Sequence, residues 1–293
     1  MYKTRSVQAC FRAAYDLFCS NFKTILQKTW MPAVVLSLVM GLYGVICPTN
    51  LITLLLGEQP PVQPLGTSLL LVAVYFAMLA ATIWLYAIFF SLLNGRPHKE
   101  NGGRVLRTTG IFLLVGCVGG IFLAIISILL ASRTITPHES PRCLPVLAFI
   151  VVLICLFVMC MLALIPSIYS AIKYIMEPSQ KAWSIFGKPY RQGWHHWGFL
   201  FVCALLCFII GALLSSIAQM PSGIMMLGKL ASAGGTLMGD PDGLPSYFNI
   251  TFYATSSLAQ FVCCYLTMWV ATVFYYAYGS IEAKMRETTQ TTK

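Results

Sequence analysis

The chain has 293 residues, of which 58% are hydrophobic and only 10% are charged, and its mean hydropathy is +0.78. Charged residues make up about 25% of an ordinary soluble domain, so this composition excludes a soluble globular fold and indicates an integral membrane protein. The net charge of +10 does not indicate a nucleic-acid partner, because the basic residues lie at the ends of apolar segments and not along one exposed domain.

The first element in chain order is an amphipathic leader over residues 6–28. Its apolar residues, among them Ala14 and Phe18, recur at three- and four-residue steps, and Arg12 and Lys23 occupy intervening positions. The pattern predicts a helix that lies on the inner membrane surface. No small-x-small cleavage pattern follows, so we expect the leader to remain in the mature protein.

Six apolar stretches follow, each long enough to cross a hydrocarbon core of about 30 Å. The predicted spans cover residues 30–47, 68–93, 111–131, 144–170, 197–218 and 251–276. We therefore predict an all-α fold, a polytopic transmembrane bundle that forms a single membrane domain over residues 1–293. Pro166 is expected to break the fourth span, and residues 220–247 are expected to form the longest outer loop.

The basic residues fix the expected orientation. Of the 19 Lys and Arg residues, sixteen precede span one, follow an even-numbered span or lie in the tail, and three lie in the other loops. Because positively charged flanks resist translocation, both termini are predicted to be cytoplasmic, with residues 279–293 as a cytoplasmic tail.

Six residues are expected to anchor the protein at the inner interface: Trp30, Trp194, Trp197, Arg12, Lys23 and Arg191. Trp rings favour the headgroup region, and basic side chains favour anionic headgroups. His195 and His196 lie between two of these Trp residues, where imidazoles can contact headgroups. A metal site there would need further ligands.

A second amphipathic element is predicted over residues 179–190. The segment from Ala182 to Phe186 matches the segment from Ala14 to Phe18 at a constant offset of 168 residues, and Arg191 then matches Lys23. The match predicts a parallel internal repeat, with chance similarity as the alternative.

This layout resembles a group of bacterial inner-membrane proteins. The resemblance lies in the two surface helices, the kinked fourth span and the linker from Glu177 to Gln180, and it covers most of the chain. The group comprises proteins related to the membrane domain of glycerophosphoryl diester phosphodiesterases and to the YciC-like six-span proteins. The resemblance implies a helical bundle in the bacterial inner membrane, and it implies no catalytic residue, because that chemistry resides in a separate soluble domain.

Catalytic and metal-binding patterns are absent from the sequence. None of the nine Asp and Glu residues falls in a predicted span, and neither a nucleophile motif nor a zinc motif occurs, so we predict no catalytic residue, no metal and no cofactor. A disulfide between Cys47 and Cys143 is conceivable on the outer side. Gly116 and Gly120 give span three a smooth face for packing against another helix.

One weakly polar stripe stands out in span six. Its members, with two residues of span five that can face them, are Tyr253, Ser256, Gln260, Thr267, Ser215 and Gln219. The stripe fits either hydrogen bonds between helices or a cavity for an amphiphile or a small neutral solute.

These features favour a non-enzymatic protein that organises the membrane or binds lipid. Membrane lipids are the expected partners, with an unidentified protein on the cytoplasmic face as a further candidate, and no nucleic acid is expected. The alternative is a permease, or a transporter's membrane subunit, for a small neutral or amphiphilic solute. A lipid-modifying enzyme would have only His195, His196 and Glu177 near an interface.

Overall fold

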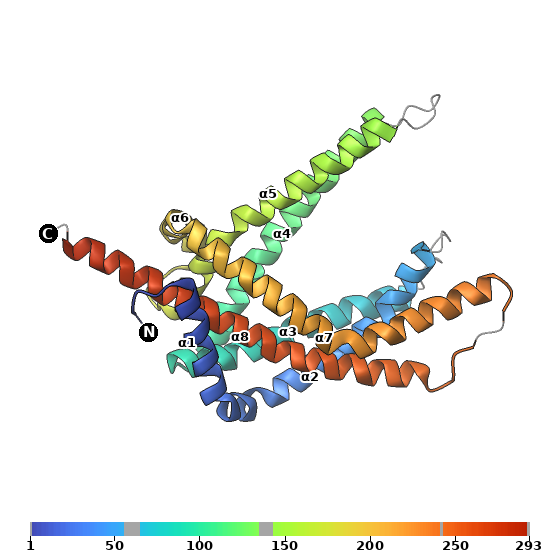
Figure 1. Ribbon diagram of the computed structural model, residues 1–293, viewed down its shortest axis with the longest axis horizontal. Helices are drawn as coiled ribbons and strands as arrows, with labels where there is room; N and C mark the ends of the chain where they lie inside the picture. The colour runs from blue at the N-terminus through green and yellow to red at the C-terminus, as the bar shows by residue number, and fades with distance from the viewer. Residues whose placement is uncertain (1, 56–64, 135–142, 241–242, 292–293) are drawn as a thin grey trace. The chain divides into compact units, whose positions relative to one another are not determined.

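The computed structural model describes residues 2–55, 65–134, 143–240 and 243–291 (Figure 1). The regular elements within these ranges are all helices, as predicted. They are α1 (Val7–Ser20), α2 (Phe22–Leu55), α3 (Leu65–Asn94), α4 (His98–Thr134), α5 (Cys143–Met176), the 3₁₀ helix η1 (Ala182–Phe186), α6 (Lys188–His195), α7 (Trp197–Leu237) and α8 (Phe248–Thr291).

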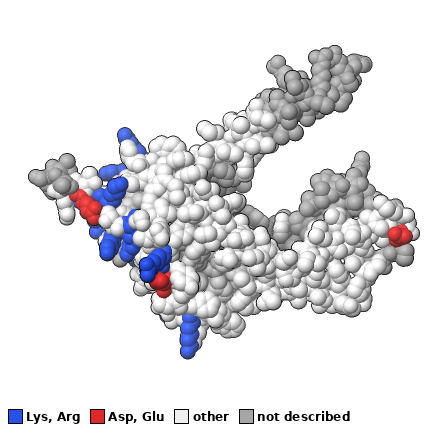
Figure 2. All heavy atoms as spheres, viewed as in Figure 1, with Lys and Arg blue, Asp and Glu red and all other residues white. Residues whose placement is uncertain are grey.

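Six of these helices are long and apolar enough to cross a membrane, which confirms the expected number of spans and a multi-pass membrane protein. The six segments are Phe22–Ile46, Leu65–Asn94, His98–Ile126, Ile154–Met176, Trp197–Thr236 and Phe248–Gln290. Figure 2 shows that long stretches of these helices carry neither basic nor acidic side chains on the face in view.

The leader is two helical pieces and not the single helix expected over 6–28. α1 ends at Ser20, and α2 begins at Phe22. The side-chain amide of Asn21 donates to the carbonyl oxygen of Leu17 at 2.9 Å, and the Ser20 hydroxyl donates to the same oxygen at 3.2 Å. Both side chains compete with the backbone for a helical acceptor, which ends α1 at this point.

Two other segments expected to lack helix are helical. α7 continues through Pro221 to Leu237, so most of the region 220–247 is helix and not loop. α8 continues past residue 276 to Thr291, so most of the expected tail belongs to the last helix. The run of Glu, Ala, Lys, Met and Arg after residue 281 consists of strong helix formers, which explains the extension.

The helices belong to two compact units, whereas the sequence suggested one domain. Unit 1 comprises Met1–Val7, Gly103–Ala204 and Ala277–Lys293, and unit 2 comprises Gln8–Gly102 and Leu205–Tyr276. Neither unit corresponds to one half of the sequence. The internal repeat stays a prediction, and its two copies differ locally: Ala14 and Phe18 are buried in α1, whereas Phe186 is exposed at the end of η1.

Unit 2 has an apolar core in which α1, α2, α3 and α8 meet. Its buried members are Phe18, Ile25, Ala33, Leu36, Ala81, Leu85, Phe89, Cys264, Tyr265 and Met268. Gly41 on α2 lies directly against Ser257 on α8, and a β-carbon added at Gly41 would overlap the serine hydroxyl. The small residue therefore permits the close approach of these two helices.

In unit 1, side chains of α6 and α7 bond to α5 near Pro166. Pro166 has no backbone N–H, which leaves the carbonyl oxygen of Leu162 without its helical partner. The indole N–H of Trp197 donates to that oxygen at 3.2 Å, and the Tyr190 hydroxyl donates to the carbonyl oxygen of Ala163 at 2.7 Å. The break predicted at Pro166 is not observed, because α5 runs as one helix from Cys143 to Met176. Side chains from α6 and α7 bond to the carbonyl oxygens near the proline.

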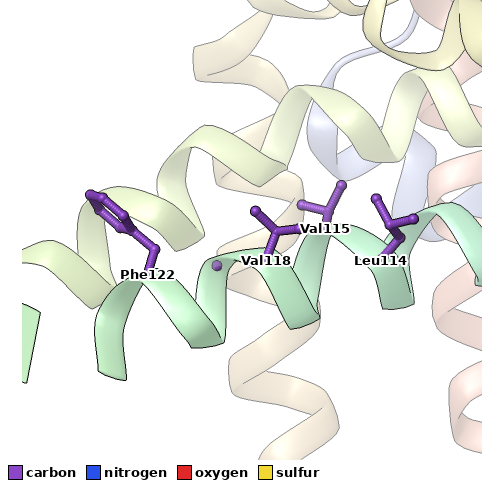
Figure 3. Close-up of a pocket in the computed structure, with 5 residues that line it drawn as sticks. Leu114, Val115, Val118 and Phe122 are labelled. Carbon is purple, nitrogen blue, oxygen red and sulfur yellow. The ribbon is translucent and has the colours of Figure 1, made fainter. Parts of the chain in front are cut away.

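α4 and α5 run side by side, and both expose apolar side chains along much of their lengths (Figure 1). Figure 3 shows Leu114, Val115, Val118 and Phe122 on α4, which line a shallow cavity of about 380 Å³ with Gly119. Since every lining group is apolar, this surface suits lipid chains. Among the described residues, a β-carbon built at Gly116 or Gly120 meets no atom within 4 Å apart from the helix's own backbone, so the described residues leave the predicted packing face uncovered.

Candidate functional site

The N-terminal segment of the chain lies against the C-terminal part of α8, within unit 1. The backbone N–H of Arg5 donates to the Ser280 hydroxyl oxygen at 2.8 Å, and that hydroxyl donates back to the carbonyl oxygen of Arg5 at 3.0 Å. The Tyr2 ring packs edge-on against Tyr278, and the Arg286 guanidinium carbon lies 4.3 Å from the centre of the Tyr2 ring. Residues 2–5 are therefore held on α8 by hydrogen bonds and a cation–π contact.

This attachment completes a small cavity, which we call the basic cavity. It has a volume of about 100 Å³ and is lined by Arg5, His196, Phe199, Ser280, Ile281 and Lys284. Its lining comes from the N-terminal segment, the turn between α6 and α7, the start of α7, and α8. Three of the six lining residues are basic and none is acidic, so the electrostatic potential in the cavity favours an anion.

The walls of the basic cavity differ in polarity. Ser280 and Ile281 are buried, Phe199 is half-buried, and Lys284 is exposed at the rim. Nδ1 of His196 lies 3.2 Å from the carbonyl oxygen of Gln192, which can only accept a hydrogen bond. The proton of the neutral imidazole therefore belongs on Nδ1. The cavity thus combines apolar lining residues, Phe199 and Ile281, with basic ones. This combination fits a group at the boundary between lipid and water.

The opposite side of α8 carries a buried ion pair. Nζ of Lys173, on α5, lies 2.6 Å from Oε1 of Glu282, on α8, and the two residues are 8% and 7% exposed. The Tyr169 hydroxyl donates to the same carboxylate oxygen. The lysine also donates to the Tyr169 hydroxyl and to the side-chain oxygen of Gln192, both at 3.3 Å. All three ammonium protons thus have acceptors, which is the condition for burying a charge at tolerable cost.

A larger cavity opens beside this ion pair. It has a volume of about 390 Å³ and is lined by Lys173, Gln192, Glu282, Met285, Arg286, Thr289 and Gln290. The α8 members recur at three- and four-residue steps and so form one helical face. Because Lys173 is fully engaged by its three acceptors, the ion pair joins α5, α6 and α8 and is not a ready binding group.

The linker after α5 is also fixed to its neighbours. The Tyr278 hydroxyl donates to Oε1 of Glu177 at 2.8 Å. The Arg104 guanidinium donates to the carbonyl oxygens of Tyr174, Glu177 and Pro178 at the end of α5. Arg104 thus caps the C-terminus of α5, where orphan carbonyls need donors and a cation is favourable. Arg104 itself lies on α4, which begins at His98.

The residues of the predicted polar stripe have different environments in unit 2. Ser256 is buried, Tyr253, Gln260 and Ser215 are half-buried, and Thr267 and Gln219 are exposed. An apolar groove of about 460 Å³ lies between α7 and α8, and a different set of residues lines it: Leu214, Ile217, Ala218, Pro221, Thr255, Leu258, Ala259, Val262 and Leu266. None of the six residues of the predicted stripe lines this groove.

The predicted interface anchors are mostly exposed. This is so for Trp30, Trp194, Arg12, Lys23 and Arg191, whereas Trp197 is half-buried and bonded to α5. Within the described ranges, no group of three His, Cys, Asp or Glu side chains lies close enough to hold a metal ion. The side chains of Cys47 and Cys143 lie outside the described residues.

The comparisons with known proteins identify no family for this chain. The chain matches no protein-family model, no curated protein and no solved structure among those searched.

Proposed function

We propose that the protein binds anionic phospholipid headgroups at the cytoplasmic surface of a bacterial inner membrane and organises the membrane there. The observation that carries the proposal is the basic cavity, where Arg5, His196 and Lys284 converge beside Phe199 and Ile281. A headgroup phosphate offers the charge that the basic side chains favour, and the apolar Phe199 and Ile281 suit the first carbons of a lipid.

The charge distribution supports the cytoplasmic placement. The sixteen-to-three asymmetry of basic residues predicts an inward-facing N-terminus and C-terminus. The contact between Arg5 and Ser280 is in keeping with both ends lying on one side. The bacterial inner membrane comes from the layout resemblance. The lining of the cavity supports a non-enzymatic role, because it has no carboxylate and its Ser280 hydroxyl is bonded to the Arg5 backbone.

A permease for a small neutral or amphiphilic solute is the second candidate. The groove between α7 and α8 favours it, because its volume of about 460 Å³ is that of a small-molecule site. Thr255 is the polar member of its lining, so the groove suits an apolar chain better than a hydrophilic solute. We therefore rank permeation below headgroup binding.

Native mass spectrometry of the full-length protein in detergent tests the proposal. The protein is mixed with phosphatidylglycerol or phosphatidylcholine of identical acyl chains, and the bound fraction is measured for wild type, Lys284→Gln and Lys188→Gln. Lys188 is the matched control, because it is an exposed lysine of unit 1 outside the basic cavity. We expect wild type to retain phosphatidylglycerol preferentially.

The Lys284→Gln change should weaken phosphatidylglycerol binding about tenfold, the size of one lost charge-assisted hydrogen bond, and Lys188→Gln should leave it nearly unchanged. Equal retention of the two lipids by wild type, or equal losses in both variants, would contradict headgroup binding in the basic cavity.

A further inference from the structure

The chemical class of the anion can be narrowed further, and this step rests on the proposed function. We infer that the basic cavity selects a phosphate group with at most one ester bond, as in phosphatidic acid or free phosphate, over the phosphodiester of other lipids. Two properties of the cavity carry the inference: its charge and the hydrogen-bonding state of His196.

The charge of the cavity suits a dianion. Arg5 and Lys284 bring two positive charges to one lining, and none of its other members is acidic. A phosphate monoester carries a charge of about −1.5 to −2 at pH 7, whereas a phosphodiester carries one negative charge. The monoester therefore gains more attraction from these two positive charges than the diester does.

The volume of the cavity is sufficient for a phosphate group. A water molecule needs only about 10–15 Å³ of such cavity space, so about 100 Å³ accommodates the terminal oxygens of a phosphate group and does not by itself separate the two ester classes. The selection therefore depends on charge and on His196.

His196 distinguishes a phosphate monoester from a phosphodiester by hydrogen bonding as well as by charge. Its Nδ1 faces the Gln192 carbonyl oxygen at 3.2 Å, so Nε2 of the neutral ring is an acceptor. A phosphate monoester can present either a P–OH group, which donates to this acceptor, or a second negative oxygen, which accepts from the imidazolium. A phosphodiester has no P–OH group near neutral pH and cannot make the first interaction.

Ser280 is a positioning residue in this arrangement. Its hydroxyl accepts from the Arg5 N–H at 2.8 Å and donates to the Arg5 carbonyl oxygen at 3.0 Å. Its proton is thus committed to the N-terminal segment. The hydroxyl places the Arg5 backbone at the wall of the cavity, and the basic side chains provide the contacts to the anion.

A competition experiment on the full-length protein in detergent tests the inference. Native mass spectrometry measures the retention of phosphatidic acid, phosphatidylglycerol and phosphatidylcholine with the same acyl chains, for wild type and for His196→Phe. His195→Phe is the matched control, because His195 is an exposed neighbour that does not line the cavity. Sodium phosphate is then added to the complex with phosphatidic acid.

We expect wild type to retain phosphatidic acid about tenfold better than phosphatidylglycerol. His196→Phe should reduce this ratio severalfold with little effect on phosphatidylglycerol, and His195→Phe should preserve it. Equal or tighter binding of phosphatidylglycerol, with both lipids above phosphatidylcholine, would overturn the inference and leave the proposed function intact. Equal retention of all three lipids would overturn both.

The addition of sodium phosphate distinguishes a lipid headgroup from free phosphate as the source of the bound anion. If sodium phosphate leaves bound phosphatidic acid in place, the lipid is the ligand. If millimolar sodium phosphate displaces the lipid and raises the unfolding temperature of wild type, but not of Lys284→Gln, the same phosphate chemistry is supported with a soluble source.

Discussion

Trp197 donates its indole N–H to the one carbonyl oxygen, that of Leu162, which Pro166 leaves without a partner in α5. The Tyr190 hydroxyl bonds the next carbonyl oxygen along the chain, that of Ala163. A proline in a membrane helix is tolerated when side chains of neighbouring segments satisfy the freed backbone groups. The short helix α6 and the start of α7 perform this role here.

Removing the indole N–H should destabilise the protein. Trp197→Phe keeps an aromatic ring but leaves the Leu162 carbonyl oxygen unpaired, which costs about 1–3 kcal/mol. We expect a lower unfolding temperature in detergent, measured by intrinsic or dye fluorescence. Trp183→Phe is the control, because that ring is 77% exposed. Similar losses in the two variants would contradict a specific role for the Trp197 hydrogen bond.

Gly193 should resist enlargement. A β-carbon at this position would lie 2.8 Å from the carbonyl oxygen of Pro166, where backbone atoms cannot easily yield. Gly193→Ala is therefore expected to lower stability by about 1–3 kcal/mol. Gly198→Ala meets no atom within 4 Å, so the higher helix propensity of Ala should leave stability unchanged or raise it by up to about 1 kcal/mol.

The same thermal assay checks both glycine variants. An unfolding temperature for Gly193→Ala at or above that of wild type would show that α6 does not need this close approach to Pro166.

The buried ion pair should show strong coupling between its partners. Lys173→Met leaves the Glu282 carboxylate buried without its counterion, and such a loss costs about 3–5 kcal/mol. Adding Glu282→Gln removes the stranded charge while the amide oxygen still accepts from Tyr169. We expect the double variant to be more stable than Lys173→Met alone.

Unfolding temperatures of wild type, both single variants and the double variant form a cycle that isolates this coupling. A double variant whose loss equals the sum of the two single losses would mean that the ion pair does not join α5 to α8 energetically.

The orientation can be tested with single cysteines in a variant that lacks the native ones. Asn101 is unsuitable as a labelling site, because its side chain is buried and bonded to Asn94 at 2.9 and 3.1 Å. Lys99 and Ser246 are exposed and flank different spans. A membrane-impermeant thiol reagent on intact cells should label Ser246→Cys and not Lys99→Cys. Labelling of Lys99→Cys before lysis would reverse the predicted orientation.

The sequence predicted the spans well because their signal is local: length and apolar composition suffice to recognise a helix that can cross a membrane. Helix ends were less predictable. Asn21 ends α1 through a side-chain bond that the apolar pattern does not reveal, and Pro221 interrupts the pattern of α7 without ending the helix. Proline inside a membrane helix is a weak stop signal.

The candidate site could not be predicted, because its members are far apart in the chain. Arg5 and Lys284 were recognised only as orienting charges, and His196 only as a headgroup contact. Lys173 and Glu282 are separated by 109 positions, and no spacing in the sequence relates them. The sequence does contain one indication of the site. The strong helix formers after residue 281 predict that α8 continues, which places Lys284 on the last helix and not in the tail.

The hydrogen bonds between Arg5 and Ser280 join positions 275 residues apart, which sets an order of events during synthesis. Arg5 leaves the ribosome long before its partner exists, and α8 is the last described helix to be made. The N-terminal segment therefore cannot form its hydrogen bonds to Ser280 until the preceding spans have been made. The basic cavity closes only when residues 280–284 have been translated, so a chain that stops earlier would insert most of its spans and still lack the anion site.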